Sequence, residues 1–231
     1  MNKEEFVKWL DKLGIVFTED KLKKLEEYYN LLITWNEMIN LTAITEKEAV
    51  YLKHFYDSLT LARDVDFNKD ISICDVGSGA GFPGIVLKIV FPNIKITLVD
   101  SLNKRVTFLN EVIKKLELSD IEAVHARMED YSVNNEEKFD VITSRAVASI
   151  PFISEISVRS LKTGGIFALM KGKPEEDSES AYKKLGLSLI KKDEFKLPIE
   201  NSDRCIVVLK KTSKTDKIYP RNITKIQKFP L

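Results

Sequence analysis

The N-terminal part of the chain has the hydrophobic pattern of amphipathic helices. Apolar side chains return every three or four positions, for example at Leu22 and Leu25, which is the spacing of a single buried face. Thr45 is followed three positions later by Glu48, and this pair matches a capping box that would start another helix. We therefore predict a helical extension over residues 1–68 whose apolar face packs on the rest of the protein.

Beyond residue 68 the pattern changes to short β-rich runs separated by stretches of helical length. The predicted strands are 71–76, 94–100, 121–125, 139–143 and 165–170, and the predicted helices are 83–90, 102–116 and 150–161. This alternation is typical of a parallel sheet with crossover helices. Two further runs, 187–197 and 204–211, have no helix between them and should form a hairpin at the sheet edge. We predict an α/β fold over residues 69–211, with a seven-stranded, mostly parallel sheet and an antiparallel edge strand.

Composition places the chain among ordinary folded proteins. Its 231 residues are 44% hydrophobic and 31% charged, which fits one α/β domain with appendages. Cys74 and Cys205 stand in apolar, β-rich segments, so they read as buried thiols rather than a disulfide, and this favours a reducing, cytoplasmic location. The sequence has no signal-peptide pattern and no apolar run near the roughly 18 residues that cross a bilayer, so no membrane is expected.

The C-terminal tail, residues 212–231, is locally basic although the whole chain has a net charge of only +1. Its cations are Lys214, Lys217, Arg221, Lys225 and Lys228, and its aromatic residues are Tyr219 and Phe229. Such a strip suits RNA, because cations contact phosphates and aromatic rings stack on bases. A solvated tail without a partner is an equally good interpretation.

A glycine-rich turn is the sharpest chemical signal in the sequence. Gly77, Gly79 and Gly81 follow a predicted buried strand, and Pro83 suits the first turn of the next helix. Glycine permits positive φ angles and lets a ligand approach the backbone closely. Asp100 ends the next strand, about 20 residues further on, where its carboxylate can accept hydrogen bonds from both hydroxyls of a ribose. The alternative role for Asp100 is to cap the following helix.

The turn favours S-adenosylmethionine (SAM) over a dinucleotide. A dinucleotide needs the turn and the helix N-terminus to hold a pyrophosphate, usually through G-x-G-x-x-G. This turn reads G-x-G-x-G-F-P-G and is preceded by Asp75. A negative charge at that position opposes a pyrophosphate but complements the ammonium and sulfonium groups of SAM. We therefore predict a SAM-dependent methyltransferase rather than an NAD-dependent dehydrogenase.

The segment after the fourth predicted strand narrows the possible acceptor atoms. It contains no cysteine, which cytosine C5 methylation needs as a nucleophile, and no Asn-Pro-Pro-aromatic turn of the kind that exocyclic amine methylation commonly uses. Guanine N7 has an exposed lone pair and no proton to remove, so its methylation requires positioning more than a base. Arg145 in this segment could orient guanine or line the cofactor pocket. A salt bridge to a carboxylate at the end of the sheet is the simpler alternative.

Several motifs together resemble the bacterial RsmG (GidB) family, which methylates N7 of a guanosine in the decoding-region loop of 16S ribosomal RNA. The resemblance runs nearly end to end. It is carried by Trp35-Asn36, Asn40-Leu41-Thr42, the segments 54–59, 75–83 and 99–105, Ser144-Arg145-Ala146-Val147-Ala148, and Tyr219-Pro220-Arg221. Without this resemblance, the residues support only a SAM-dependent methyltransferase, and a small-molecule methyltransferase or a non-catalytic RNA-binding module stays open.

The resemblance also implies site residues and partners. With the glycine turn and Asp100, the cofactor-binding set becomes Gly77, Gly79, Phe82, Asp100, Met128, Glu129 and Arg145. No catalytic residue and no metal are predicted.

His54 and Asp57 should share a helix face, toward the active-site mouth or against the core. Lys104 and Arg105 either lie at a helix start without a partner or contact RNA phosphate. Gly84 is the one departure in the loop, at a position that varies in the family, and it puts no function in doubt. The expected substrate is 16S ribosomal RNA or the small ribosomal subunit, and the expected state is a cytoplasmic monomer.

Overall fold

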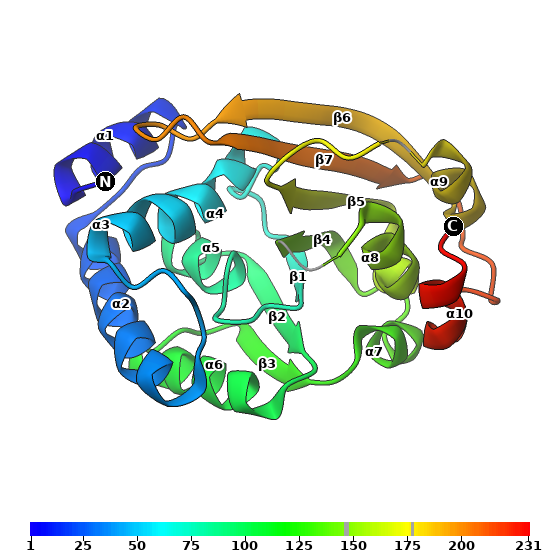
Figure 1. Ribbon diagram of the computed structural model, residues 1–231, viewed down its shortest axis with the longest axis horizontal. Coiled ribbons are helices and arrows are strands. Elements are labelled where there is room, and N and C mark those ends of the chain that lie inside the picture. The colour runs from blue at the N-terminus through cyan, green and yellow to red at the C-terminus, as the bar shows by residue number, and fades with distance from the viewer. Residues whose placement is uncertain (146–147, 177) are drawn as a thin grey trace.

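The fold is a three-layer α/β arrangement with one sheet between two layers of helices (Figure 1). The computed structural model describes residues 1–145, 148–176 and 178–231. Within these ranges seven strands form a single sheet in the order β3-β2-β1-β4-β5-β7-β6. The strands are β1 (Ser72–Val76), β2 (Lys95–Asp100), β3 (Ile121–His125), β4 (Phe139–Arg145), β5 (Leu161–Lys171), β6 (Leu187–Lys196) and β7 (Asp203–Lys211).

The sheet confirms the predicted topology. Strands β1 to β5 run parallel to one another, and β7 pairs antiparallel with both β5 and β6 at one edge. The structure adds that β7, which lies between β5 and the outermost strand β6, is the strand that runs against the others. All seven predicted strands are present. The predicted helix 150–161 is too long, because a short 3₁₀ turn, Val158–Ser160, ends it and β5 begins at Leu161.

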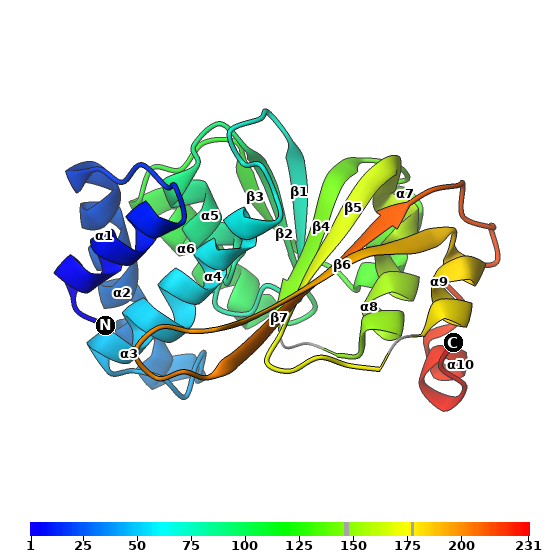
Figure 2. The same ribbon diagram turned by 90° about the horizontal axis from the view of Figure 1, so that it is seen from above.

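Helices cover both faces of the sheet, as the two views in Figures 1 and 2 show. One layer contains α1 (Lys3–Lys12), α2 (Glu19–Ile39), α3 (Lys47–Val50), a π-helical segment (Tyr51–Tyr56), α4 (Asp57–Leu59), a 3₁₀ turn (Thr60–Arg63), α5 (Gly84–Val90) and α6 (Asn103–Lys115). The other contains α7 (Met128–Asn134), α8 (Ile150–Ser157), α9 (Glu179–Leu185) and α10 (Ile223–Lys228). The sequence pattern did not predict α7, α9 or α10.

Alternate residues of the central strands supply two separate cores. On β1, Ile73 belongs to the core under α2 and α5, whereas Cys74 belongs to the core under α8. The same alternation separates Ile206 from Cys205 on β7, because successive side chains of a strand point to opposite faces. Both cysteines are free and buried, as predicted.

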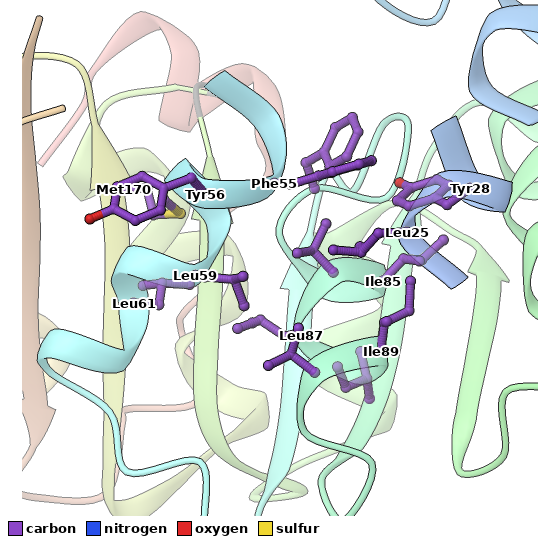
Figure 3. Close-up of a cluster of buried hydrophobic side chains, with 14 of the residues drawn as sticks. Leu25, Tyr28, Phe55, Tyr56, Leu59, Leu61, Ile85, Leu87, Ile89 and Met170 are labelled. Atoms are coloured by element: carbon purple, nitrogen blue, oxygen red, sulfur yellow. The ribbon is translucent and has the colours of Figure 1, made fainter. Parts of the chain in front are cut away.

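The N-terminal helices share the first of these cores. Tyr28 of α2 and Phe55 of the π-helical segment converge on Ile85 of α5 (Figure 3). The predicted capping box is wrong by one residue: Glu46, not Thr45, caps α3, and its carboxylate accepts hydrogen bonds from the backbone N–H groups of residues 48 and 49. The helical extension therefore packs directly on the helix that follows the glycine turn.

The C-terminal tail packs on α8 rather than extending into solvent. Both carboxylate oxygens of buried Glu155 accept hydrogen bonds from the Arg221 guanidinium, at 2.6 and 2.7 Å. Tyr219 and Ile226 are buried, whereas Phe229 is exposed. The prediction that Tyr219 offers its ring to a base is therefore wrong. Across the described residues, none of the helices is both long and apolar enough to cross a membrane.

Candidate active site

A cavity of about 690 Å³ lies at the carboxyl ends of the parallel strands. The turn after β1 and Asp100 at the end of β2 form one side of it, which we call the turn wall (residues 77–81 and Asp100). All of these residues except Gly81 line the cavity. Four side chains from separate elements form the other side, which we call the charge wall: His54, Asp57, Arg145 and Arg204. The volume falls within the range of small-molecule and cofactor sites.

Positive φ angles shape the turn wall. Gly77, Gly79 and Gly81 have φ values of 68°, 58° and 95°, a region that L side chains rarely adopt. A Cβ on Gly79 would meet only the Gly77 carbonyl oxygen, at 3.9 Å, whereas a Cβ on Gly81 would lie 2.7 Å from the Tyr28 hydroxyl. That hydroxyl donates a hydrogen bond to the Ala80 carbonyl. Helix α2 of the N-terminal extension thus packs against the turn at Gly81 and leaves the side at Gly79 open.

Asp75 does not have the role that the sequence suggested. It is fully buried beneath the turn and is not among the residues that line the cavity. Its Oδ2 accepts a hydrogen bond from the Gly84 N–H at 2.9 Å, and its Oδ1 has no hydrogen-bond partner among the described residues. Burial raises the pKa of Asp75 to about 7. The carboxyl group therefore holds the start of α5 instead of facing a cationic ligand.

Gly84, for which no role was expected, has no room for a side chain. A Cβ at this position would lie 2.3 Å from Leu98 Cδ2 and 2.8 Å from Asp75 Oδ2. Glycine here lets α5 pack against β2 while its first N–H reaches the buried carboxyl group. The constraint comes from a neighbouring strand, so the local sequence could not reveal it.

Asp100 is not the N-cap of α6, because that position is Leu102 and no side chain caps it. Its Oδ2 accepts a hydrogen bond from the Gly79 N–H at 2.8 Å, and its Oδ1 accepts one from the Leu102 N–H at 2.9 Å. Arg105 Nη1, which lines the cavity, is the second donor to Oδ2, at 3.4 Å. Oδ1 keeps one further lone pair. Asp100 therefore ties the turn to the residue before α6 and still presents an acceptor to the cavity.

The charge wall begins with a stack of His54, Phe82 and Arg145. The His54 ring stacks on Phe82 with centroids 4.4 Å apart, and the Arg145 guanidinium carbon lies 5.1 Å from the Phe82 centroid. Arg145 Nη2 lies 3.2 Å from His54 Nδ1, and His54 Nε2 lies 2.9 Å from Thr42 Oγ1. Nδ1 also lies 3.2 Å from the Lys53 carbonyl oxygen, so it faces both a donor and an acceptor. Burial and the Arg145 charge lower the pKa of His54 to about 3.

Asp57 joins two arginines that come from different strands. Its Oδ1 accepts a hydrogen bond from Arg204 Nε at 3.0 Å, and its Oδ2 lies 3.4 Å from Arg145 Nη1. The same Nη1 donates to the Lys53 carbonyl oxygen at 2.8 Å. Burial raises the pKa of Asp57, although both arginines act against that rise. His54 and Asp57 do line the cavity, and Arg145 both lines it and forms the salt bridge considered as its alternative role.

Other predicted site residues lie elsewhere. Met128 and Glu129 begin α7 and are not among the residues that line the cavity, and Met128 is buried in the core under α8. Ala146 and Val147, which belong to one of the family motifs, lie outside the described residues. Arg204 was missed, because an arginine at the start of a strand carries no local signal of a site.

A second cavity, of about 500 Å³, lies between the α1–α2 turn and the segments 62–68 and 90–93. Gly14, Asp64 and Asp66 line it, but its segments lie before the starts of β1 and β2 rather than after the carboxyl ends of strands. We therefore assign the chemistry to the first cavity. Among the residues that the structure describes, no group of three or more His, Cys, Asp or Glu side chains is placed to hold a metal ion.

Comparison with known proteins gives consistent matches. A family model described as "GidB: rRNA small subunit methyltransferase G" matches residues 21–206. The chain is 45% identical to a protein named "Ribosomal RNA small subunit methyltransferase G" of Lysinibacillus sphaericus, with all of both chains covered. It is 47% identical to the protein of the same name in Bacillus cereus, over 100% of this chain and 99% of that one.

Solved structures with low sequence identity share the fold. A SAM-dependent methyltransferase from Aquifex aeolicus has a TM-score of 0.52 at 18% identity, over 71% of this chain and 93% of that one. The [4+2]-cyclase SpnF has a TM-score of 0.55 at 12% identity, over 70% and 82%. Because one of these is named as a cyclase, the fold alone does not fix the reaction.

Proposed function

The chain belongs to the rRNA small subunit methyltransferase G family, and we propose that it transfers a methyl group from SAM to N7 of a guanosine in 16S ribosomal RNA. The proposed target is the decoding-region guanosine numbered 527 in the usual scheme. The observation that carries the proposal is the meeting, in one cavity, of an open glycine turn, the Asp100 carboxylate and the paired Arg145 guanidinium.

The turn wall fits SAM by shape and by the type of its polar groups. A ligand can lie against Gly79, because a side chain there would extend into open space. Asp100 supports the cofactor assignment because the remaining lone pair of its Oδ1 can accept from a ribose hydroxyl. Phe82, which is 6% exposed, offers an apolar surface beside the turn. When bound, SAM supplies an electrophilic methyl group on its sulfonium.

The remaining contacts are assigned by position. Arg145 can donate to an anionic group, since its guanidinium lies beside Phe82 and lines the cavity. We propose Gly77 and Gly79 as backbone contacts. Met128 and Glu129 follow β3, which pairs with β2 so that His125 lies opposite Asp100. A ligand that extends past Asp100 would therefore approach them, and we keep both as proposed cofactor contacts.

The charge wall suits an acceptor that has no proton to lose. His54 is the imidazole beside the turn, but Arg145 and the Lys53 carbonyl oxygen contact its Nδ1, Thr42 contacts its Nε2, and burial lowers its pKa to about 3. It is therefore a positioning group rather than a general base. Methylation of guanine N7 needs no base, because the attacking lone pair lies in the ring plane and carries no hydrogen.

Basic residues around the cavity support a nucleic-acid acceptor. Of the charged residues that line it, Lys53, Arg105, Arg145, Lys171 and Arg204 are cationic, whereas Asp57 and Asp100 are anionic. A cationic cavity rim favours phosphate groups of RNA. We propose 16S ribosomal RNA, free or within the small subunit, as the partner of a monomeric cytoplasmic enzyme.

The test is methyl transfer from labelled SAM to small ribosomal subunits purified from cells that lack the gene. Nuclease digestion and mass analysis then identify the modified nucleoside. We expect one 7-methylguanosine per subunit, and no label when Gly79→Val replaces the wild-type protein, because that side chain would fill the cofactor side of the cavity. SAM binding without transfer to RNA would refute the proposal and point to a small-molecule acceptor. RNA binding without SAM binding would point to a non-catalytic module.

A further inference from the structure

The turn between β6 and β7, residues 197–202, lies at the same edge of the sheet as the cavity. Strand β6 runs in the direction of the parallel strands, so the following turn leaves the sheet at the same edge, and it extends beyond the strand ends toward the N-terminal helices (Figure 2). Glu200 in the turn forms an ion pair of 2.8 Å with Lys53, which lines the cavity. Arg204, just after the turn, is part of the charge wall. The turn is therefore a fixed part of the cavity rim.

The tip of this turn has an unfavourable backbone conformation for its residue. Ile199 has a φ of 71°, and the Glu200 N–H donates to the Pro198 carbonyl oxygen at 2.8 Å. A hydrogen bond across one residue with positive φ is the rarer and more strained form of γ-turn. A β-branched residue is a poor choice for positive φ, whereas glycine and asparagine adopt it readily. The turn geometry therefore does not account for isoleucine at this position.

Burial does not account for it either. The Ile199 side chain is 55% exposed, although Leu197 at the base of the same turn is fully buried. Leu197 also exchanges backbone hydrogen bonds with the far side of the turn: its N–H donates to the Ser202 carbonyl oxygen at 2.9 Å, and its own carbonyl accepts from the Asn201 N–H at 3.1 Å. A firmly held loop thus presents one apolar side chain to solvent at the cavity rim.

The surroundings of Ile199 suit RNA. The cations of the turn and its contacts are Lys53, Lys196 and Arg204, and each is paired with a carboxylate. Lys53 and Arg204 also belong to the cavity lining, in which cations outnumber carboxylates. Such a rim can place phosphates by charge while the apolar tip contacts a base. A base that enters an enzyme cavity must first leave its stack, and proteins that unstack bases often insert an apolar side chain between them.

We propose that Ile199 is a wedge that packs against the base next to the target guanosine and so holds the target unstacked in the cavity. This inference rests on the proposed function and names a positioning residue for it. The occupant of the rim is then an RNA base rather than another protein. This role explains the strained turn, because the turn holds a stiff, branched side chain outward at a fixed distance from the cavity.

The test separates the apolar side chain from the turn geometry. Ile199→Asn suits positive φ and removes the apolar tip, whereas Ile199→Leu keeps an apolar tip. Each variant is compared with the wild type in kcat/KM on small subunits, in Kd for SAM and in thermal stability. For Ile199→Asn we expect stability at least equal to that of the wild type, an unchanged Kd and a kcat/KM about tenfold lower. Ile199→Leu should keep most of the wild-type kcat/KM.

The outcomes are distinguishable. A wild-type rate for Ile199→Asn overturns the wedge, and so does an equal loss in both variants, because the turn and not the apolar tip would then matter. If the wild-type protein itself transfers no methyl group to the subunits, the proposed function fails and the wedge fails with it. A loss confined to Ile199→Asn, with an active wild-type protein, supports both.

Discussion

The two walls of the cavity are held in place by different interactions. The turn wall depends on backbone geometry: three glycines with positive φ, an N–H bound to Asp100, and a helix start that leaves no room for a Cβ at Gly84. The charge wall depends on ionised side chains, with Asp57 between Arg145 and Arg204. The turn wall should therefore be disrupted by substitutions that add atoms, and the charge wall by substitutions that remove a charge.

The largest effect should come from an added methyl group beneath the turn. In Gly84→Ala, the new Cβ would lie 2.3 Å from Leu98 Cδ2, so β2 or α5 must shift. We expect the free energy of unfolding to fall by about 3 kcal/mol, measured by urea denaturation.

The matched control is Gly172→Ala, whose Cβ would meet nothing within 4 Å. Its free energy of unfolding should stay within about 0.5 kcal/mol of the wild-type value. If the two variants were equally stable, the turn wall would not be sterically fixed.

Removing the carboxylate of the charge wall should have the next largest effect. Asp57→Ala leaves Arg145 and Arg204 without their shared partner. Because both arginines keep some solvent access, we expect a loss of about 2 kcal/mol, below that of a fully buried pair.

The control for this variant is Glu200→Ala, which breaks the partly exposed pair with Lys53 and should cost about 1 kcal/mol or less. Thermal unfolding at matched pH compares the two. A smaller loss for Asp57→Ala than for Glu200→Ala would show that the network does not hold the charge wall.

Cofactor affinity should respond to a substitution at Gly79. In Gly79→Ala the Cβ points into open space, so the cost is mainly the positive φ, about 1 kcal/mol of stability. The same methyl group would occupy the surface assigned to SAM, and calorimetry should show a Kd about tenfold higher. An unchanged Kd would mean that the cofactor does not lie against this turn.

The smallest effects should appear as opposite pH dependences. The folded-state pKa of Asp75, about 7, lies above its ordinary value of 3.8, so its contribution to stability is present at low pH and is lost as pH rises toward 7. The folded-state pKa of His54, about 3, lies below 6.5, so its contribution is present above 6.5 and is lost as pH falls.

Urea unfolding at pH 6 and pH 7 tests this pair of signs. Between those two pH values, the stability of the wild type relative to Asp75→Asn should fall, and relative to His54→Gln it should rise, each by about 1 kcal/mol. If the stability of the wild type changed in the same direction relative to both variants, the burial described for Asp75 or for His54 would be wrong.

The difference between the walls also explains what the sequence could predict. The glycine turn and Asp100 follow from a contiguous strand–turn–helix pattern, and the alternation of the strands predicted the sheet. Gly84 was missed because its neighbour Leu98 is on another strand. Asp75 was misjudged because its position on β1 did not reveal that its side chain lies beneath α5.

The charge wall was only partly predictable, because it joins elements that are far apart in the sequence. His54 and Asp57 were found through the family motif, but their partner Arg204 lies 147 positions from Asp57. Helix α7, which takes Met128 away from the cavity lining, was not predicted either. Which side chains meet across the sheet depends on tertiary packing, and no local spacing encodes that.

The central claim is that the cofactor lies between these two walls. A crystal structure with S-adenosylhomocysteine, the product of methyl transfer, tests it most directly. We predict its ribose at Asp100, its chain against Gly77 and Gly79, and its carboxylate within reach of Arg145. Density for the ligand in the second cavity, between the α1–α2 turn and residues 90–93, or at neither place, would contradict the account.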